Sequence, residues 1–151
     1  MGSIFATRPG ENNDIPPIAL GSHLDTQPKG GRYDGILGVN SALEILRTIH
    51  DARYQPYAPL RVIDWTNEEG ARFPPAMIAS GVWGGAFDLE YAHECTDRDG
   101  QTVKSELERI GFLGPTSCSF AENPLSAHFE CHIEQGTLIM DCFLTFRPNI
   151  R

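Results

Sequence analysis

The chain has 151 residues, of which 40% are hydrophobic and 21% charged, and its formal net charge is −8 at pH 7. This length and composition are typical of one soluble globular domain with its own core. The negative charge argues against nucleic acid and anionic membranes as partners, because both attract clusters of Lys and Arg. The first twenty residues contain no basic segment followed by an apolar run, so no signal peptide is expected. Four separated cysteines without a CxxC pair indicate free thiols and a cytoplasmic location.

The first predicted buried strand covers residues 18–24, where an apolar run precedes a glycine-rich polar loop. A short strand is predicted before it, over residues 3–7. His23 and Asp25 are two residues apart, so they can share one face of the strand. In that arrangement an imidazole binds a metal through one nitrogen, while a carboxylate holds the other N–H. Asp34, beyond the loop, can supply an oxygen ligand. The alternative is a buried histidine paired with a carboxylate beside a polar turn.

An amphipathic helix is predicted over residues 36–53, and a second buried strand over residues 60–65. The predicted apolar face of the helix consists of Val39, Ala42, Leu43, Ile45, Leu46, Ile49 and His50. Strand, helix and strand form the parallel crossover unit of α/β proteins.

Two adjacent carboxylates, Glu68 and Glu69, follow the second predicted strand. Acids at such a turn often belong to a solvated helix start. However, parallel strands bring their carboxyl ends to the same edge of a sheet, so these side chains can reach His23 and Asp34. One carboxylate can then bind a metal, and the other can remain free as a general base.

Three shorter helical segments are predicted next. Residues 71–85 are expected to contain a short helix and a glycine-rich turn, and residues 87–93 a short helical piece. A clearer helix is predicted over residues 99–111, with Thr102 as its N-cap. Its charged residues are typical of a solvated face, and no chemistry is assigned to them.

A third strand is predicted over residues 128–133, where apolar and polar residues alternate. His132 lies near its end, beside Glu134 and Gln135. The ends of the three strands therefore offer one set of metal-ligating candidates: His23, Asp34, Glu69 and His132. The other histidines are given structural or surface roles: His50, His93 and His128.

Three ordered segments, GSHLDTQPKGGRYDGILGV, WTNEEGARF and HIEQG, resemble the zinc-dependent N-carbamoyl-amino-acid amidohydrolase family. That family includes L-carbamoylases, β-ureidopropionases and allantoate amidohydrolases, and it is related to dinuclear-metal aminoacylases and carboxypeptidases. The resemblance implies an α/β fold, with a mostly parallel sheet covered by helices in a phosphorylase/hydrolase-like catalytic domain. It also implies hydrolysis of a linear amide C–N bond, such as the carbamoyl group of N-carbamoyl amino acids or related ureido acids.

The resemblance implies two metal ions per complete active site, zinc or alternatively manganese, cobalt or nickel. His23 and His132 match ligands of the first ion, and Asp34 matches the aspartate that bridges both ions. Glu69 matches a ligand of the second ion.

Three further roles follow from the resemblance. Asp25 matches the carboxylate that orients the first histidine, Glu68 the general base, and Gln135 a polar residue near the substrate.

The resemblance ends after Gly136. It implies that residues 1–136 are the N-terminal part of a metallo-amidohydrolase catalytic domain, followed by a divergent tail over 137–151. We expect the family's lid domain, through which its members form homodimers, and the last histidine ligand of the second ion to be absent from this sequence. Low turnover by this chain is therefore expected. Two alternatives remain: a catalytically inactive metal-binding fragment, and an aminoacylase- or dipeptidase-like hydrolase.

Overall fold

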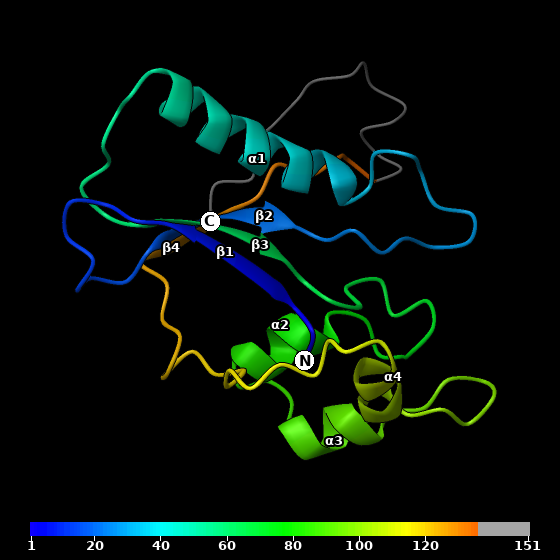
Figure 1. Ribbon diagram of the computed structural model, residues 1–151. Helices are drawn as coiled ribbons and strands as arrows, with labels where there is room; N and C mark the ends of the chain where they lie inside the picture. The colour runs from blue at the N-terminus through cyan, green and yellow to red at the C-terminus, as the bar shows by residue number, and fades with distance from the viewer. Residues whose placement is uncertain (136–151) are drawn as a thin grey trace.

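The structure, a computed structural model, describes residues 1–135 (Figure 1). Within this range one sheet has the strand order β1-β3-β2-β4. Its members are β1 (Ile4–Arg8), β2 (Ile18–Ser22), β3 (Leu60–Asp64) and β4 (Ala127–Phe129). β2 is parallel to both β3 and β4, whereas β1 is antiparallel to β3. The prediction of a mostly parallel sheet is confirmed, with one antiparallel strand at its edge.

Helices cover both faces of this sheet (Figure 1). α1 (Ile36–Asp51) connects β2 to β3 and packs against both strands. The shorter helices gather on the other face: α2 (Ile78–Trp83), α3 (Leu89–Glu94) and α4 (Val103–Arg109). The predicted strand–helix–strand unit is therefore present.

The sheet and the short helices share an apolar core. Ala19 and Ile63 are fully buried on the face opposite α1, beside Trp65. Trp83 of α2 packs on Trp65 with ring centroids 5.4 Å apart. The short helices close over a second buried cluster: Met1, Phe73, Ile78, Ala79, Val82, Ala92, Val103 and Leu107. This packing holds the sheet edge that carries the site.

The predicted apolar face of α1 is only partly correct. Val39 and Ala42 are buried, but Leu43 is 46% exposed and Ile45 42% exposed. The helix approaches the sheet along small residues, since a Cβ at Gly38 would lie 2.6 Å from the Ser22 Cβ. The larger side chains consequently flank the contact.

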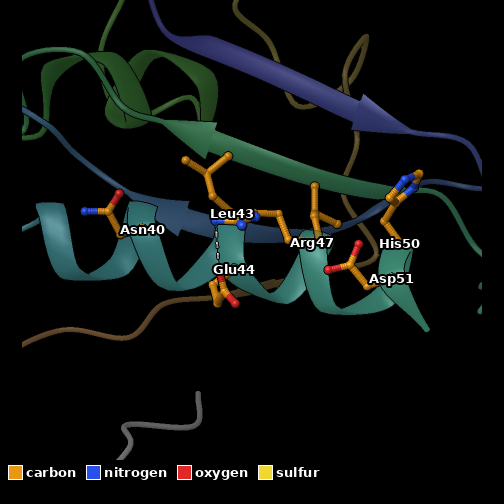
Figure 2. Close-up of a pocket in the computed structure, with 7 residues that line it drawn as sticks. Asn40, Leu43, Glu44, Arg47, His50 and Asp51 are labelled. Atoms are coloured by element: carbon orange, nitrogen blue, oxygen red, sulfur yellow. Dashed lines mark ion pairs between the residues drawn. The ribbon is translucent and has the colours of Figure 1, made fainter. Parts of the chain in front are cut away.

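Figure 2 shows a groove along the same helix. It is lined by Asn40, Leu43, Glu44, Leu46, Arg47, His50 and Asp51. None of these residues belongs to the predicted site, and we assign the groove no chemistry.

α4 is shorter than predicted, but its N-cap is confirmed. The Thr102 hydroxyl accepts the Ser105 N–H at 3.0 Å, and the Ser105 hydroxyl accepts the Thr102 N–H at 3.1 Å. This reciprocal pair is a capping box. The helix begins later than residue 99 because the Asp97 carboxylate accepts the N–H groups of Asp99 and Gln101, which holds these residues in a turn.

The third predicted strand is also shorter. β4 pairs with β2 only as far as Leu20 opposite Phe129. β2 itself ends at Ser22, so the chain beyond Phe129 soon lacks a neighbouring strand for ladder hydrogen bonds. The segment that carries His132 is therefore irregular rather than extended sheet.

Among residues 1–135, no helix is long and apolar enough to cross a membrane. Cys95, Cys118 and Cys131 are free cysteines. The predicted tail over 137–151, including Cys142, lies outside the described residues.

Candidate metal centre

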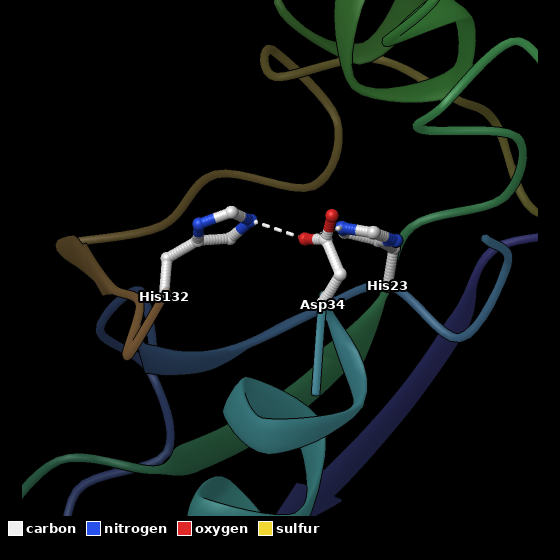
Figure 3. A group of neighbouring side chains, drawn as sticks. All are labelled: His23, Asp34 and His132. Atoms are coloured by element: carbon white, nitrogen blue, oxygen red, sulfur yellow. Dashed lines mark ion pairs between the residues drawn. The ribbon is translucent and has the colours of Figure 1, made fainter. Parts of the chain in front are cut away.

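Three predicted metal ligands meet at the carboxyl edge of the sheet (Figure 3). His23 directly follows β2, Asp34 precedes α1, and His132 follows β4. One ligand atom from each lies within 4.8 Å of the others. Segments separated by more than 100 residues in sequence thus converge here, as expected from parallel strands that end at one edge.

His23 presents its Nε2 atom to this centre. The side chain is 1% exposed, and its Nδ1 lies 2.8 Å from the backbone carbonyl oxygen of Asp25. A carbonyl oxygen only accepts, so Nδ1 carries the proton and Nε2 keeps its lone pair. Nε2 lies 3.8 Å from Asp34 Oδ1 and 3.4 Å from Glu68 Oε2.

His132 has the same orientation. Its Nδ1 lies 2.8 Å from the backbone carbonyl oxygen of Ile133, and its Nε2 lies 3.0 Å from Asp34 Oδ1. Both imidazoles therefore direct Nε2 at the same carboxylate oxygen. Asp34 Oδ1 thus faces two nitrogen lone pairs without a donor, an arrangement that a cation stabilises.

The buried atoms of this cluster fit a divalent metal ion. His23 Nε2 and Asp34 Oδ1 are buried without a hydrogen-bond partner. Glu69 Oε1, on the residue after Glu68 and outside this cluster, is also buried without one. Two imidazole nitrogens and a carboxylate oxygen are a donor set that zinc and related ions favour.

Asp25 acts differently from the prediction. The carboxylate was expected to hold the His23 N–H, but the Asp25 backbone carbonyl does so, and the carboxylate oxygen lies farther away at 3.7 Å. The carboxylate instead accepts the backbone N–H groups of Glu68 at 3.1 Å and Glu69 at 3.0 Å. It therefore fastens the turn after β3 to the end of β2, because one charged group satisfies two backbone donors.

Glu68 stands beside the candidate metal ligands, with Oε2 3.4 Å from His23 Nε2. Burial raises the pKa of its carboxyl above the ordinary value; His23 opposes this shift, and the carboxylates of Glu69 and Asp25 reinforce it. A raised pKa makes a carboxylate a better proton acceptor near neutral pH.

Glu69 lies outside the three-residue cluster. The Gln27 amide donates to the Glu69 backbone carbonyl at 2.8 Å and to Oε2 at 3.3 Å, which leaves the buried Oε1 without a partner. Gln27 was not predicted from the sequence.

Gln135 contacts the centre directly, because its side-chain amide donates to Asp34 Oδ2. The other described histidines have no place in the cluster; His128, for example, accepts the Trp65 indole N–H at 3.4 Å.

Sequence reasoning also missed the pair formed by Ser22 and Glu130. The available signal was spacing, since Ser22 precedes His23 and Glu130 lies two residues before His132.

The chain is similar to several known amidohydrolases. An N-carbamoyl-L-amino-acid amidohydrolase of Rhizobium meliloti is 50% identical over 139 residues, which cover 92% of this chain and 33% of that protein. An allantoate amidohydrolase of Bacillus subtilis is 33% identical, with 90% and 33% covered. A crystal structure of an amidase of the hydantoinase/carbamoylase family from Burkholderia multivorans superposes with a TM-score of 0.87 at 48% identity, covering 93% of this chain and 34% of that one.

The resemblance to carbamoyl-amide hydrolases is therefore confirmed, and the chain spans about a third of the length of the curated relatives it matches. The family is metal-dependent, and a group that can hold a metal is present in this chain. Residues 19–141 match peptidase family M20/M25/M40, and the chain belongs to that family.

Proposed function

We propose that this chain carries the first metal site and the general base of a metal-dependent amidohydrolase. The observation that carries the proposal is the convergence of His23, Asp34 and His132 with the Glu68 carboxylate beside them. In this proposal residues 1–136 are the N-terminal part of the catalytic domain. The free thiols of the described cysteines are consistent with a cytoplasmic location.

His23, Asp34 and His132 would hold the first divalent ion, zinc or manganese, cobalt or nickel. Asp34 and Glu69 would contribute to a second. The buried, unpartnered Oε1 of Glu69 supports this assignment, because such an atom is costly without a cation or a donor. When bound, such ions polarise the scissile carbonyl and lower the pKa of water.

Glu68 would accept the proton of the attacking water and return it to the leaving nitrogen. Its partly buried carboxylate lies beside His23, and the two oxygens of Asp25 fix the backbone of its turn. Asp25 thereby keeps Glu68 in place and, through its carbonyl, selects the His23 tautomer. The Gln135 amide donates a hydrogen bond to Asp34 and would exchange it for one to the substrate.

The proposed substrates are N-carbamoyl amino acids or related ureido acids, in which a linear amide C–N bond is cleaved. The names of the relatives support this class: N-carbamoyl-L-amino-acid amidohydrolase and allantoate amidohydrolase.

The test combines metal binding with turnover. Calorimetric titration of the 151-residue chain with zinc should show one ion bound more tightly than a second, and His23→Ala should abolish the tight site. Ammonia release is then measured from N-carbamoyl-β-alanine, N-carbamoyl-L-amino acids and allantoate. Glu68→Gln should retain zinc and lose whatever turnover the chain has, by roughly 100-fold or more for a general base.

The outcomes separate the alternatives. Faster release from N-acetyl amino acids or dipeptides would favour an aminoacylase- or dipeptidase-like hydrolase. Tight zinc binding without turnover would show that this chain is a metal-binding fragment without catalytic activity. Unchanged zinc affinity in His23→Ala would contradict the site itself.

A further inference from the structure

His132 occupies its position without support from the sheet. β4 ends at Phe129, three residues earlier, and the His132 side chain is still 33% exposed. Neither ladder hydrogen bonds nor deep burial therefore fix its distance to Asp34. The Gln135 amide, three residues later, donates to Asp34, but the segment between β4 and His132 must be held by another contact.

The Ser22–Glu130 hydrogen bond supplies that contact. Ser22 is fully buried, and its hydroxyl donates to Glu130 Oε1 at 2.5 Å. A hydroxyl bound to a carboxylate makes a short, charge-assisted bond that is stronger than one between neutral groups. It joins the residue before His23 to the residue two positions before His132.

Gly38 of α1 closes the same junction. A Cβ at this position would lie 2.6 Å from the Ser22 Cβ and 2.7 Å from the Cys131 backbone oxygen. The end of β2, the first turns of α1 and the segment after β4 are thus in close contact here. His23 directly follows the first of these segments, Asp34 precedes the second, and His132 lies in the third.

We propose that Ser22 and Glu130 form a positioning pair that sets His132 against Asp34. Neither residue touches the reacting atoms in this proposal; they act through the histidine. The inference rests on the proposed function, because it takes His132 to be a metal ligand.

Zinc affinity of the full chain is the first measurement. Ser22→Ala and Glu130→Ala should each weaken zinc binding by about 10- to 100-fold, as for other groups that orient a metal ligand. The double variant should lose little more than either single variant, because both remove the same bond. Glu130→Gln should retain most of the affinity, since its amide oxygen can still accept the Ser22 hydroxyl. Glu122→Ala, at an exposed acid in the loop before β4, should bind like the unmodified chain.

The metal-free chain provides the second measurement. Nuclear Overhauser effects between imidazole resonances should show the His132 ring beside the His23 ring, with ring centroids 6.0 Å apart, in the unmodified chain and in Glu130→Gln. That proximity should be lost in Ser22→Ala and Glu130→Ala. Retention of that proximity and of zinc affinity in the alanine variants would overturn the inference. Failure of the unmodified chain to bind zinc would contradict the proposed function. The imidazole resonances would still show whether Ser22 and Glu130 position His132. Equal losses of affinity in Glu130→Gln and Glu130→Ala would show that the charge, rather than the hydrogen bond, is what matters, and would also overturn it.

Discussion

Gly35 determines whether His23 can occupy its place in the site. Its φ of 68° lies in the left-handed region that favours glycine, and a Cβ there would lie 2.4 Å from both Cε1 and Nδ1 of the His23 ring. The turn before α1 therefore passes so close to the His23 imidazole that no side-chain atom fits between them. Only a residue without a side chain lets the chain supply Asp34 and still leave His23 in position.

Gly35→Ala is expected to weaken zinc binding by about 10- to 100-fold, because the His23 ring must shift away from the added methyl group. The variant also incurs a left-handed backbone cost of about 1–2 kcal/mol. Calorimetric titration with zinc and urea denaturation measure the two effects separately.

Gly111→Ala is the matched control for that prediction. Gly111 has a similar φ of 73°, but a methyl group added there would have no atom within 4 Å beyond its chain neighbours. This variant should lose only the left-handed backbone contribution of about 1–2 kcal/mol and keep its zinc affinity. Equal affinities in the two variants would contradict the proposed role of Gly35.

At the scale of elements, Arg72 joins the segment after β3 to α4. Its guanidinium lies 2.8 Å from Glu106 Oε2 and 2.8 Å from Asp97 Oδ2. Arg109 adds a further contact at 2.8 Å to Glu106 Oε1. Hydrogen bonds from Arg109 and Arg72 lower the pKa of Glu106 from 4.5 to about 2. These contacts hold α4 against the segment that follows β3 and the Glu68–Glu69 turn.

The lowered pKa predicts how this link depends on pH. A carboxyl whose pKa is depressed by folding stabilises the folded state above its unfolded pKa, and that contribution is lost as pH falls through the folded value. The difference in urea midpoint between the unmodified chain and Glu106→Gln should therefore be constant above about pH 5 and shrink between 4.5 and about 2. Glu108→Gln, at an exposed acid of the same helix, controls for the change of net charge. A midpoint difference at about pH 2 that is as large as the difference above about pH 5 would refute this account.

At the scale of the whole molecule, the sheet holds its carboxyl edge in place through a core on the face opposite α1. Ile63 of β3, one of the two interior strands, is fully buried there, next to Ala19 of β2. Burying an aliphatic side chain of this size contributes about 1.5–3 kcal/mol, and its removal also leaves a cavity. A typical domain has only about 5–15 kcal/mol of stability in total.

Ile63→Ala should therefore lower the unfolding free energy by about 2–5 kcal/mol in urea denaturation. Ile45→Ala makes the same chemical change on the exposed side of α1 and should alter it by no more than about 0.5 kcal/mol. Similar losses of unfolding free energy in both variants would contradict the exposed position of Ile45 on α1.

The sequence alone predicted the strand–helix–strand unit and the sheet edge at which its polar residues meet. It did so because these features depend on local patterns, namely apolar runs, glycine-rich turns and the shared direction of parallel strands. The types of ligand were also evident, since His23, Asp34 and His132 each stand near the boundary of a predicted element.

Only the tertiary structure decided how those groups contact one another. It showed that the Asp25 carbonyl, rather than its carboxylate, holds His23, and that Glu130 reaches Ser22 across 108 positions of sequence. It also showed that small residues bring α1 onto the sheet, which leaves Leu43 exposed. Local spacing sets which side chains can face the same way, but hydrogen-bond partners depend on ångström-scale distances between segments remote in sequence. Packing of the complete core fixes those distances.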